Sequence, residues 1–191
     1  HGRAQHTGPD AEAHQKEVRQ ERAGEEPARQ AVEREQGRDA PEDAPGLGRE
    51  SNHVTIDANL GQNASGVLYA LGGASGGLAL YMDQGELVYE YNMMIIERYT
   101  ARSKSKLRAG KHRIEVDTAI AKPGAPAAVV ITVDGTEVAR TTVKRTVPAA
   151  FTASETFDVG VDLGSPVSLA YFDRRPFKFD GTISAVDVAL R

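Results

Sequence analysis

The feature that most limits the fold is a series of short apolar runs after Glu50, separated by Gly, Pro and Asp residues that favour turns. Several of these runs alternate between apolar and polar residues. In residues 112–118, for example, Ile114 and Val116 alternate with charged residues. Successive side chains of a strand point to opposite faces, so this alternation indicates a half-buried antiparallel strand.

Ten such segments are predicted as strands, and they recur at intervals typical of an all-β sandwich. They cover residues 54–60, 66–71, 78–82, 87–92, 95–100, 112–118, 129–133, 136–143, 157–161 and 182–190. Asp134-Gly135 lies between two of them and is a strong signal for a hairpin turn. No segment after residue 50 has the pattern of a long amphipathic helix, which argues against a parallel α/β sheet. The sequence therefore predicts an antiparallel β-sandwich.

Residues 1–50 differ in composition from the rest of the chain. Their only large aliphatic side chains are Val18, Val32 and Leu47, and every Phe and Tyr lies at or after Tyr69. A segment with so little apolar surface cannot offset the entropy lost on folding. Residues 11–36 are rich in helix-favouring residues, but isolated helices of this kind are marginal. We therefore predict a charged low-complexity tail over residues 1–50, disordered or a fraying helix, and a β-sandwich domain over residues 51–191.

The charges divide at the same boundary. Residues 1–50 carry 8 basic and 12 acidic residues, a balance of −4, whereas residues 51–191 carry 15 of each and are neutral. A neutral domain gives no reason to expect nucleic acid or an anionic membrane as a partner. No run approaches the roughly 18 apolar residues that a transmembrane segment needs, so none is expected.

The chain has no cysteine, which excludes disulfides, thiolate metal sites and thiol nucleophiles. It begins at His1, without Met or a signal-like segment. We interpret this start as that of a fragment, and the sequence assigns it no cellular location.

Residues 73–77 fit the G-x-S-x-G pattern, with Ser75 as a possible nucleophile. The pattern normally joins a strand to a helix, yet a strand-like run follows here. Only His53 and His112 are available as bases in the predicted domain. A flexible glycine turn is therefore the better interpretation, and no catalytic residue is predicted.

Asp158, Asp162 and Asp173 are candidates for oxygen ligands of a calcium ion. Their spacing fits no metal-binding loop, and aspartates in turns commonly hydrogen-bond the nearby backbone. They are therefore weak candidates, and no metal site is predicted.

Tyr89, Tyr91, Arg98 and Tyr99 form the cluster whose chemistry best suits a binding site. Aromatic rings and a guanidinium group together stack on and hydrogen-bond a sugar or an anion. However, Leu87, Tyr89 and Tyr91 alternate along one strand face, which also fits a buried core. Ligand contact and packing in a core or interface both remain open for these residues.

Several short motifs follow one another in a characteristic order and spacing. They are Gly66-Val67-Leu68, Gly72-Gly73, Leu80-Tyr81, Tyr89-Glu90-Tyr91-Asn92, Glu97-Arg98-Tyr99, Ala109-Gly110-Lys111-His112, Val133-Asp134-Gly135, Asp158-Val159-Gly160-Val161-Asp162-Leu163-Gly164-Ser165-Pro166-Val167 and Phe179-Asp180-Gly181-Thr182-Ile183. Together they resemble the C-terminal region of bacterial arylsulfatases, and the likeness runs from about residue 53 to residue 190. The resemblance implies a jelly-roll-like β-sandwich of the concanavalin-like or laminin-G-like kind.

The catalytic part of that family has no counterpart in this chain. Family members hydrolyse sulfate esters with a formylglycine made from the Cys or Ser of a C/S-x-P-x-R motif, beside a calcium ion in a separate α/β domain. This chain lacks cysteine, the S-x-P-x-R motif and a preceding α/β stretch. The resemblance therefore implies no catalytic residue and no cofactor in this chain; a parent sulfatase would use formylglycine and calcium.

Two functions follow as expectations. The first is a noncatalytic accessory sandwich that packs on the catalytic domain of an arylsulfatase-like protein and shapes its entrance. The alternative is a free-standing carbohydrate-binding module, because jelly rolls bind glycans on a concave sheet face or at loops. Tyr89, Tyr91 and Tyr99 open along a groove would favour sugar binding, whereas a large exposed apolar patch would favour a partner domain. A hydrolase that uses Ser75 is the least favoured reading.

Overall fold

The computed structural model describes residues 46–149, 151 and 156–191. The tail predicted over residues 1–50 thus lies almost wholly outside the described residues. Leu47, which the sequence places in that tail, is buried in the hydrophobic core with 3% of its surface exposed. The packed structure therefore includes residues before position 51.

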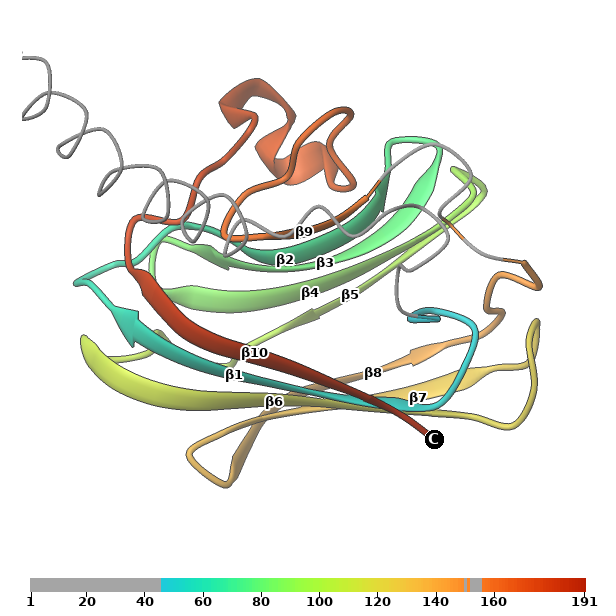
Figure 1. Cartoon of the computed structure of the whole chain (residues 1–191), viewed down its shortest axis with the longest axis horizontal. Coiled ribbons are helices and arrows are strands. Elements are labelled where there is room, and N and C mark those ends of the chain that lie inside the picture. The colour runs from blue at the N-terminus through green and yellow to red at the C-terminus, as the bar shows by residue number, and fades with distance from the viewer. Residues whose placement is uncertain (1–45, 150, 152–155) are drawn as a thin grey trace, which may run out of the picture. The chain divides into compact units, whose positions relative to one another are not determined.

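In the described part of the chain, ten strands and one short 3₁₀ helix follow one another (Figure 1). They are β1 (Asn52–Leu60), β2 (Gly66–Gly73), β3 (Gly76–Asp83), β4 (Glu86–Met93), β5 (Glu97–Arg102), β6 (Gly110–Ile120), β7 (Ala127–Val133), β8 (Thr136–Val143), β9 (Phe157–Val159), η1 (Leu169–Arg174) and β10 (Thr182–Leu190). Each predicted strand is present. Within the described residues, no helix is long and apolar enough to cross a membrane.

The strands form two five-stranded antiparallel sheets that stack face to face (Figure 1). Sheet 1 has the order β10-β1-β6-β7-β8, and sheet 2 has the order β5-β4-β3-β2-β9. The alternation seen in the sequence sets which side chains meet between them. Val54, Ile56, Ile114, Val116 and Ile131 all point inward from sheet 1 and are fully buried. The predicted antiparallel β-sandwich is confirmed.

The predicted start of the fifth strand at residue 95 is wrong. Met94 and Ile95 lie in the turn between β4 and β5, and both have positive φ values of 51° and 68°. The strand begins only at Glu97. The sequence hides this turn because it carries large apolar residues where turns normally carry Gly or Asn.

Sheet 2 is covered on its outer face as well. Residues 160–180, called the cap below, run over the side of sheet 2 that faces away from sheet 1 (Figure 1). Val167, Tyr171 and Phe177 of the cap pack on Tyr81 and neighbouring residues in a second buried cluster. The Tyr171 ring lies 5.0 Å from the Tyr81 ring and 5.1 Å from the Phe177 ring. Strands buried on both faces are usually apolar throughout, which explains the nearly continuous apolar runs of β2 and β3.

Buried polar contacts fasten the cap to sheet 2. Glu90 of β4 accepts hydrogen bonds from the Ser168 hydroxyl at 2.5 Å and from Arg98 at 2.6 Å. Within the cap itself, Asp162 accepts from the Tyr171 hydroxyl at 2.6 Å and from the Val167 backbone N–H at 3.0 Å. Burial, together with the nearby Asp162 carboxylate, raises the pKa of Tyr171 far above its usual value. These carboxylates have partners, as buried charges require, so the cap is an integral part of the fold.

The face assignment of β7 can be tested with two neighbouring valines. Val129 is fully buried between the sheets, whereas Val130 lies on the half-buried outer face. Val129→Ala should lower the free energy of unfolding by roughly 1.5 to 3 kcal/mol, because two methyl groups are lost and a cavity remains. Val130→Ala should change it by less than about 1 kcal/mol. Urea denaturation of the two variants measures this difference, and equal losses would contradict the assignment.

Candidate functional site

The predicted cluster of Tyr89, Tyr91, Arg98 and Tyr99 does not come together in the fold. Tyr89 and Tyr91 point between the two sheets and are 2% and 1% exposed. Tyr99 pairs with Tyr91, is half-buried on the same face, and donates a hydrogen bond to Glu97. Arg98 points to the opposite face, where it contacts Glu90 and the Val167 carbonyl oxygen. Tyr89 and Tyr91 therefore lie in the core between the two sheets.

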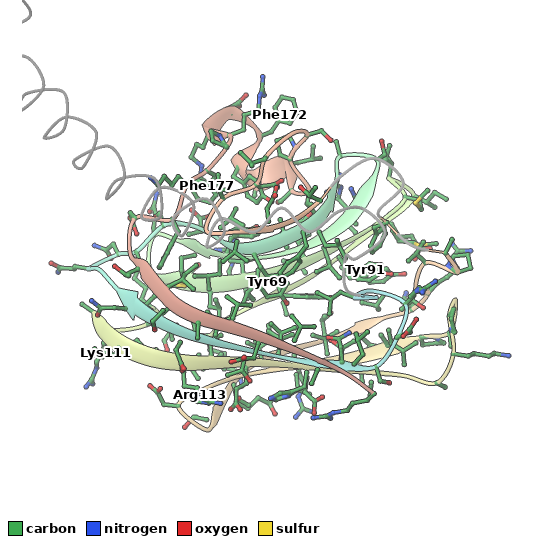
Figure 2. The ribbon with its side chains drawn as sticks, in the orientation of Figure 1. Tyr69, Tyr91, Lys111, Arg113, Phe172 and Phe177 are labelled. Atoms are coloured by element: carbon green, nitrogen blue, oxygen red, sulfur yellow. The ribbon has the colours of Figure 1, made fainter. Side chains whose placement is uncertain are left out.

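Tyr91 has a structural role instead (Figure 2). Its hydroxyl donates to the Gly48 carbonyl oxygen at 2.7 Å and accepts the Val147 backbone N–H at 2.8 Å. It thereby joins the segment before β1 and the segment after β8 to sheet 2. Burial raises the pKa of Tyr91 well above its usual value, so this residue stays a neutral hydrogen-bonding group.

The three aspartates considered as metal ligands also serve the backbone or lie at the surface. Asp158 accepts from the Thr156 hydroxyl at 2.9 Å and the Leu163 N–H at 2.7 Å. Asp162 belongs to the cap contacts described above, and Asp173 is exposed on η1. In residues 46–149, 151 and 156–191, no three His, Asp or Glu side chains gather closely enough to hold a metal ion.

Ser75 lies exposed in the tight turn between β2 and β3. His53 and His112 belong to β1 and β6 in the other sheet. His112 contacts Asp134 and the Arg108 carbonyl oxygen, and His53 lies beside Glu115. In the described structure neither histidine forms a hydrogen bond with Ser75. This arrangement is consistent with a glycine turn.

One group of residues with binding chemistry escaped the sequence analysis. Residues 102–113 comprise the last residue of β5, the connection to β6 and the first four residues of β6. This segment contains six basic residues and no acidic residue, and it is called the basic loop below. Its basic residues are Arg102, Lys104, Lys106, Arg108, Lys111 and Arg113, and all six are exposed. Figure 2 shows Lys111 extending away from the end of sheet 1.

Most of these cations have no acidic partner nearby. Arg102 pairs with Glu86 at 2.6 Å, and Arg113 lies 3.5 Å from Asp57. Among the described residues, none of the other four basic side chains lies within 4.0 Å of a carboxylate oxygen; their closest polar contact is that of Lys106, which donates to the Asn63 side chain at 3.1 Å. The basic loop therefore presents a concentration of uncompensated positive charge at one end of the sandwich.

The backbone of the basic loop is held firmly while its charged groups face solvent. Leu107 N–H donates to the Gly85 carbonyl oxygen at 2.8 Å, and the Ser103 hydroxyl accepts Leu87 N–H at 3.0 Å. At the other end of the loop, the His112 ring lies 2.8 Å from the Arg108 carbonyl oxygen and 2.7 Å from the Asp134 carboxylate. These contacts fix the direction from which the side chains leave the backbone.

Asp134 is the acidic residue that contacts His112, and its carboxylate already has hydrogen-bond donors. Its carboxylate accepts the Arg113 backbone N–H at 2.9 Å in addition to the His112 contact. The Arg113 N–H, and then His112, hold the pKa of Asp134 below its usual value, although the side chain is exposed. Nearby Glu137 is likewise occupied by Arg140. Among the described residues, neither carboxylate forms an ion pair with a lysine of the basic loop, although the pKa of Glu137 is lowered by its hydrogen bond from Arg140 and also by the charge of Lys104.

The six basic residues of this site are visible in the sequence, but the net charge of the whole domain does not reveal them. The neutral balance of residues 51–191 averages the basic loop with acidic residues elsewhere in the domain. A count over a short window would have shown six basic residues within twelve positions. Such local runs are typical of surfaces that bind polyanions.

Comparison with known proteins gives a fold but no family. No protein-family model and no curated protein matches the chain. Among solved structures, domains LG4–5 of the mouse laminin α1 chain are similar, with a TM-score of 0.57 and 17% sequence identity over 78% of this chain and 37% of that chain. The chain thus spans little more than a third of that laminin structure.

A second neighbour is the CBM40 module of the Ruminococcus gnavus IT-sialidase bound to α2,3-sialyllactose. Its TM-score is 0.54, with 15% identity over 73% of this chain and 75% of that one. The sandwich has the laminin-G-like fold that the resemblance implied. The comparisons give no support to a sulfatase origin.

The role of Tyr91 can be separated from that of its neighbour by removing single hydroxyl groups. Tyr91→Phe should lower the free energy of unfolding by roughly 2 to 4 kcal/mol, because the Gly48 carbonyl and the Val147 N–H lose their buried partner. Tyr89→Phe should lower the free energy of unfolding by less than about 1 kcal/mol, because no residue of the described structure hydrogen-bonds the Tyr89 hydroxyl. Urea denaturation of both variants measures the difference. A cost for Tyr91→Phe no larger than for Tyr89→Phe would refute this role.

Proposed function

We propose that the β-sandwich is a noncatalytic glycan-binding domain and that its basic loop binds an anionic glycan. The observation that carries this proposal is a set of four exposed cations, Lys104, Lys106, Arg108 and Lys111, on an anchored backbone. None of the four forms an ion pair with a carboxylate of the residues that the structure describes. Anionic glycans carry carboxylate or sulfate groups along a flexible chain. A row of fixed cations matches such a ligand better than it matches a neutral sugar.

The side chains of the basic loop have suitable chemistry for this ligand. The guanidinium group of Arg108 can donate two parallel hydrogen bonds to one carboxylate or sulfate, and each lysine ammonium can donate three. Charge-assisted hydrogen bonds of this kind are stronger than neutral ones. Because the groups are exposed, added salt should screen the interaction strongly.

The fold leaves the loops as the more accessible place for a glycan. In jelly-roll sandwiches an open sheet face is one common binding surface. Here the cap fills the outer face of sheet 2 with Val167, Tyr171 and Phe177. The outer face of sheet 1 carries charges that pair with one another, such as Arg113 with Asp57 and Arg191 with Asp117. Among the described residues, neither face carries as many basic side chains without an ion pair as the basic loop does.

The solved structures support a glycan rather than another polyanion. The CBM40 neighbour is bound to sialyllactose, a sugar that carries a carboxylate. Single-stranded nucleic acids usually stack their bases on exposed aromatic rings, and residues 102–113 contain none. The neutral net charge of residues 51–191 gave no reason to expect a nucleic-acid partner. We propose that nucleic acid is not the ligand of the basic loop either.

The accessory role on a sulfatase catalytic domain is the less supported reading. It rests on the motif resemblance alone, and none of the compared structures favours it. The noncatalytic character is proposed on separate grounds, because the chain lacks the C/S-x-P-x-R motif and Ser75 lies in the sheet opposite to both histidines of the sandwich.

Binding to a sulfated polysaccharide tests the proposal. The full chain should bind immobilised heparin, and the affinity should fall as ionic strength rises. The triple variant Lys106→Gln, Arg108→Gln, Lys111→Gln should bind at least about tenfold more weakly, because it removes three sources of charge-assisted hydrogen bonds. Surface plasmon resonance measures both effects.

The matched control removes the same charge from the other end of the sandwich. Lys122→Gln, Lys144→Gln, Arg145→Gln should bind a heparin oligosaccharide too short to reach two chains as tightly as the unmodified chain does, because such a ligand contacts one basic loop at a time. Equal losses in the two triple variants would show nonspecific charge attraction and overturn the assignment of the site. Binding of duplex DNA as tight as that of heparin would argue against a glycan as the ligand.

Noncatalytic character is tested with a chromogenic aryl sulfate. The full chain should not hydrolyse it, with or without calcium, even when produced in a host that installs formylglycine. Hydrolysis requires an activated nucleophile and groups that stabilise the developing charge, and the chain has no recognisable set of these. Turnover above the buffer blank that disappears in Ser75→Ala would refute this prediction.

A further inference from the structure

The turn between β4 and β5 presents an unusual apolar surface. Met94, Ile95 and Ile96 are consecutive and are 47%, 67% and 70% exposed. They are called the apolar turn below. The turn lies at the end of the sandwich opposite to the basic loop, because β5 begins after the apolar turn and leads into the basic loop (Figure 1).

The backbone of the apolar turn has a conformation that Asn and Gly adopt more easily than Met and Ile do. Ile96 N–H donates to the Met93 carbonyl oxygen at 3.0 Å, and both central residues, Met94 and Ile95, have positive φ values. This is the geometry of a type I′ turn, which favours Asn-Gly. A β-branched residue in this region is strongly disfavoured. The side chains of Met94 and Ile95 are thus not explained by the stability of the turn, which suggests that they serve an interaction.

The turn is nevertheless held in one position. The Asn92 side chain accepts Ile95 N–H at 3.0 Å and donates to the Ala74 carbonyl oxygen at 3.0 Å. Asn92 itself is fully buried. The apolar turn is therefore a fixed projection tied to the neighbouring β2–β3 turn, as a docking element requires.

The same end of the sandwich has a complementary depression. It has a volume of about 520 Å³ and is lined largely by small or apolar residues, among them Ala119, Ile120, Ala121, Pro126, Ala127 and Ala128. A short chain of contacts links it to the apolar turn, because Arg145 pairs with Glu97 at 3.2 Å and Thr146 N–H donates to the Ala125 carbonyl oxygen at 3.2 Å.

We propose that the apolar turn docks into this depression on a second copy of the chain. A projection of large aliphatic side chains and a hollow of small apolar ones are complementary in shape and chemistry. Both lie at one end of the same molecule, so a two-fold axis lets each copy supply one projection and one hollow.

The proposed pairing does not depend on the glycan site, but it would strengthen binding to long glycan chains. Association through the apolar turns leaves the two basic loops at the outer ends of the pair. Two sites on one particle bind a repeating polyanion more tightly than one site does, because the second contact is intramolecular. The dimer is therefore suited to long glycan chains.

Sedimentation equilibrium of the full chain tests the pairing. The weight-average mass should rise with concentration from 20.5 kDa toward twice that value. The variant Met94→Asn, Ile95→Gly should stay monomeric and unfold at a higher temperature, because it gives the turn its preferred residues. The separate variant Ala128→Glu, which places a charge in the depression, should also stay monomeric.

A matched control uses another exposed apolar residue. Leu169 in the cap is 66% exposed and lies outside both surfaces, so Leu169→Asn should dimerise normally. A single chain mass at every concentration would overturn the proposal. So would persistent dimers in either the turn variant or the depression variant. A chain that stays monomeric but floats with lipid vesicles only when the apolar turn is intact would replace the second copy with a membrane and also overturn it.

Discussion

The burial of sheet 2 on both faces is the constraint on which the rest of this structure depends. Its inner face packs on sheet 1 through residues such as Tyr89, and its outer face packs on the cap through Tyr81. Glu90 is a buried charged group at the junction with the cap, and Asp162 is one within the cap; each accepts hydrogen bonds from cap residues. Burying charged groups without partners would cost too much, so the cap can pack only in the arrangement that supplies those partners.

Because sheet 2 is buried on both faces, binding residues are expected on the loops rather than on the faces of that sheet. Loops positioned by a rigid scaffold commonly carry binding residues. In this chain the two ends of the β4–β5 hairpin differ in chemistry. One end projects Ile95 and Ile96, and the other leads into the basic loop with Lys106, Arg108 and Lys111. A single rigid hairpin thereby separates a surface suited to association from a surface suited to an anionic ligand.

The comparison of sequence and structure is instructive at particular residues. Period-two alternation predicted the strands correctly, because inward positions such as Ile114 and Val116 must be apolar in any two-sheet packing. It failed at Ile95, where an apolar residue occupies a turn. It also left Tyr89 and Tyr91 open between ligand contact and core. Alternation shows that residues share a face, but only the packing of the sheets shows what that face meets.

The sequence by itself therefore determined the all-β class, the approximate positions of the strands and the local concentration of charge in residues 102–113. Each of these depends on neighbours within a few positions along the chain. The tertiary structure alone decided that residues 160–180 cover sheet 2 and that Arg98 and Tyr91 point to opposite sides. It also decided that the lysines of the basic loop form no ion pair with the carboxylates of the described part of the chain. Those features depend on contacts between residues far apart in sequence, such as Glu90 with Ser168, and local patterns do not encode them.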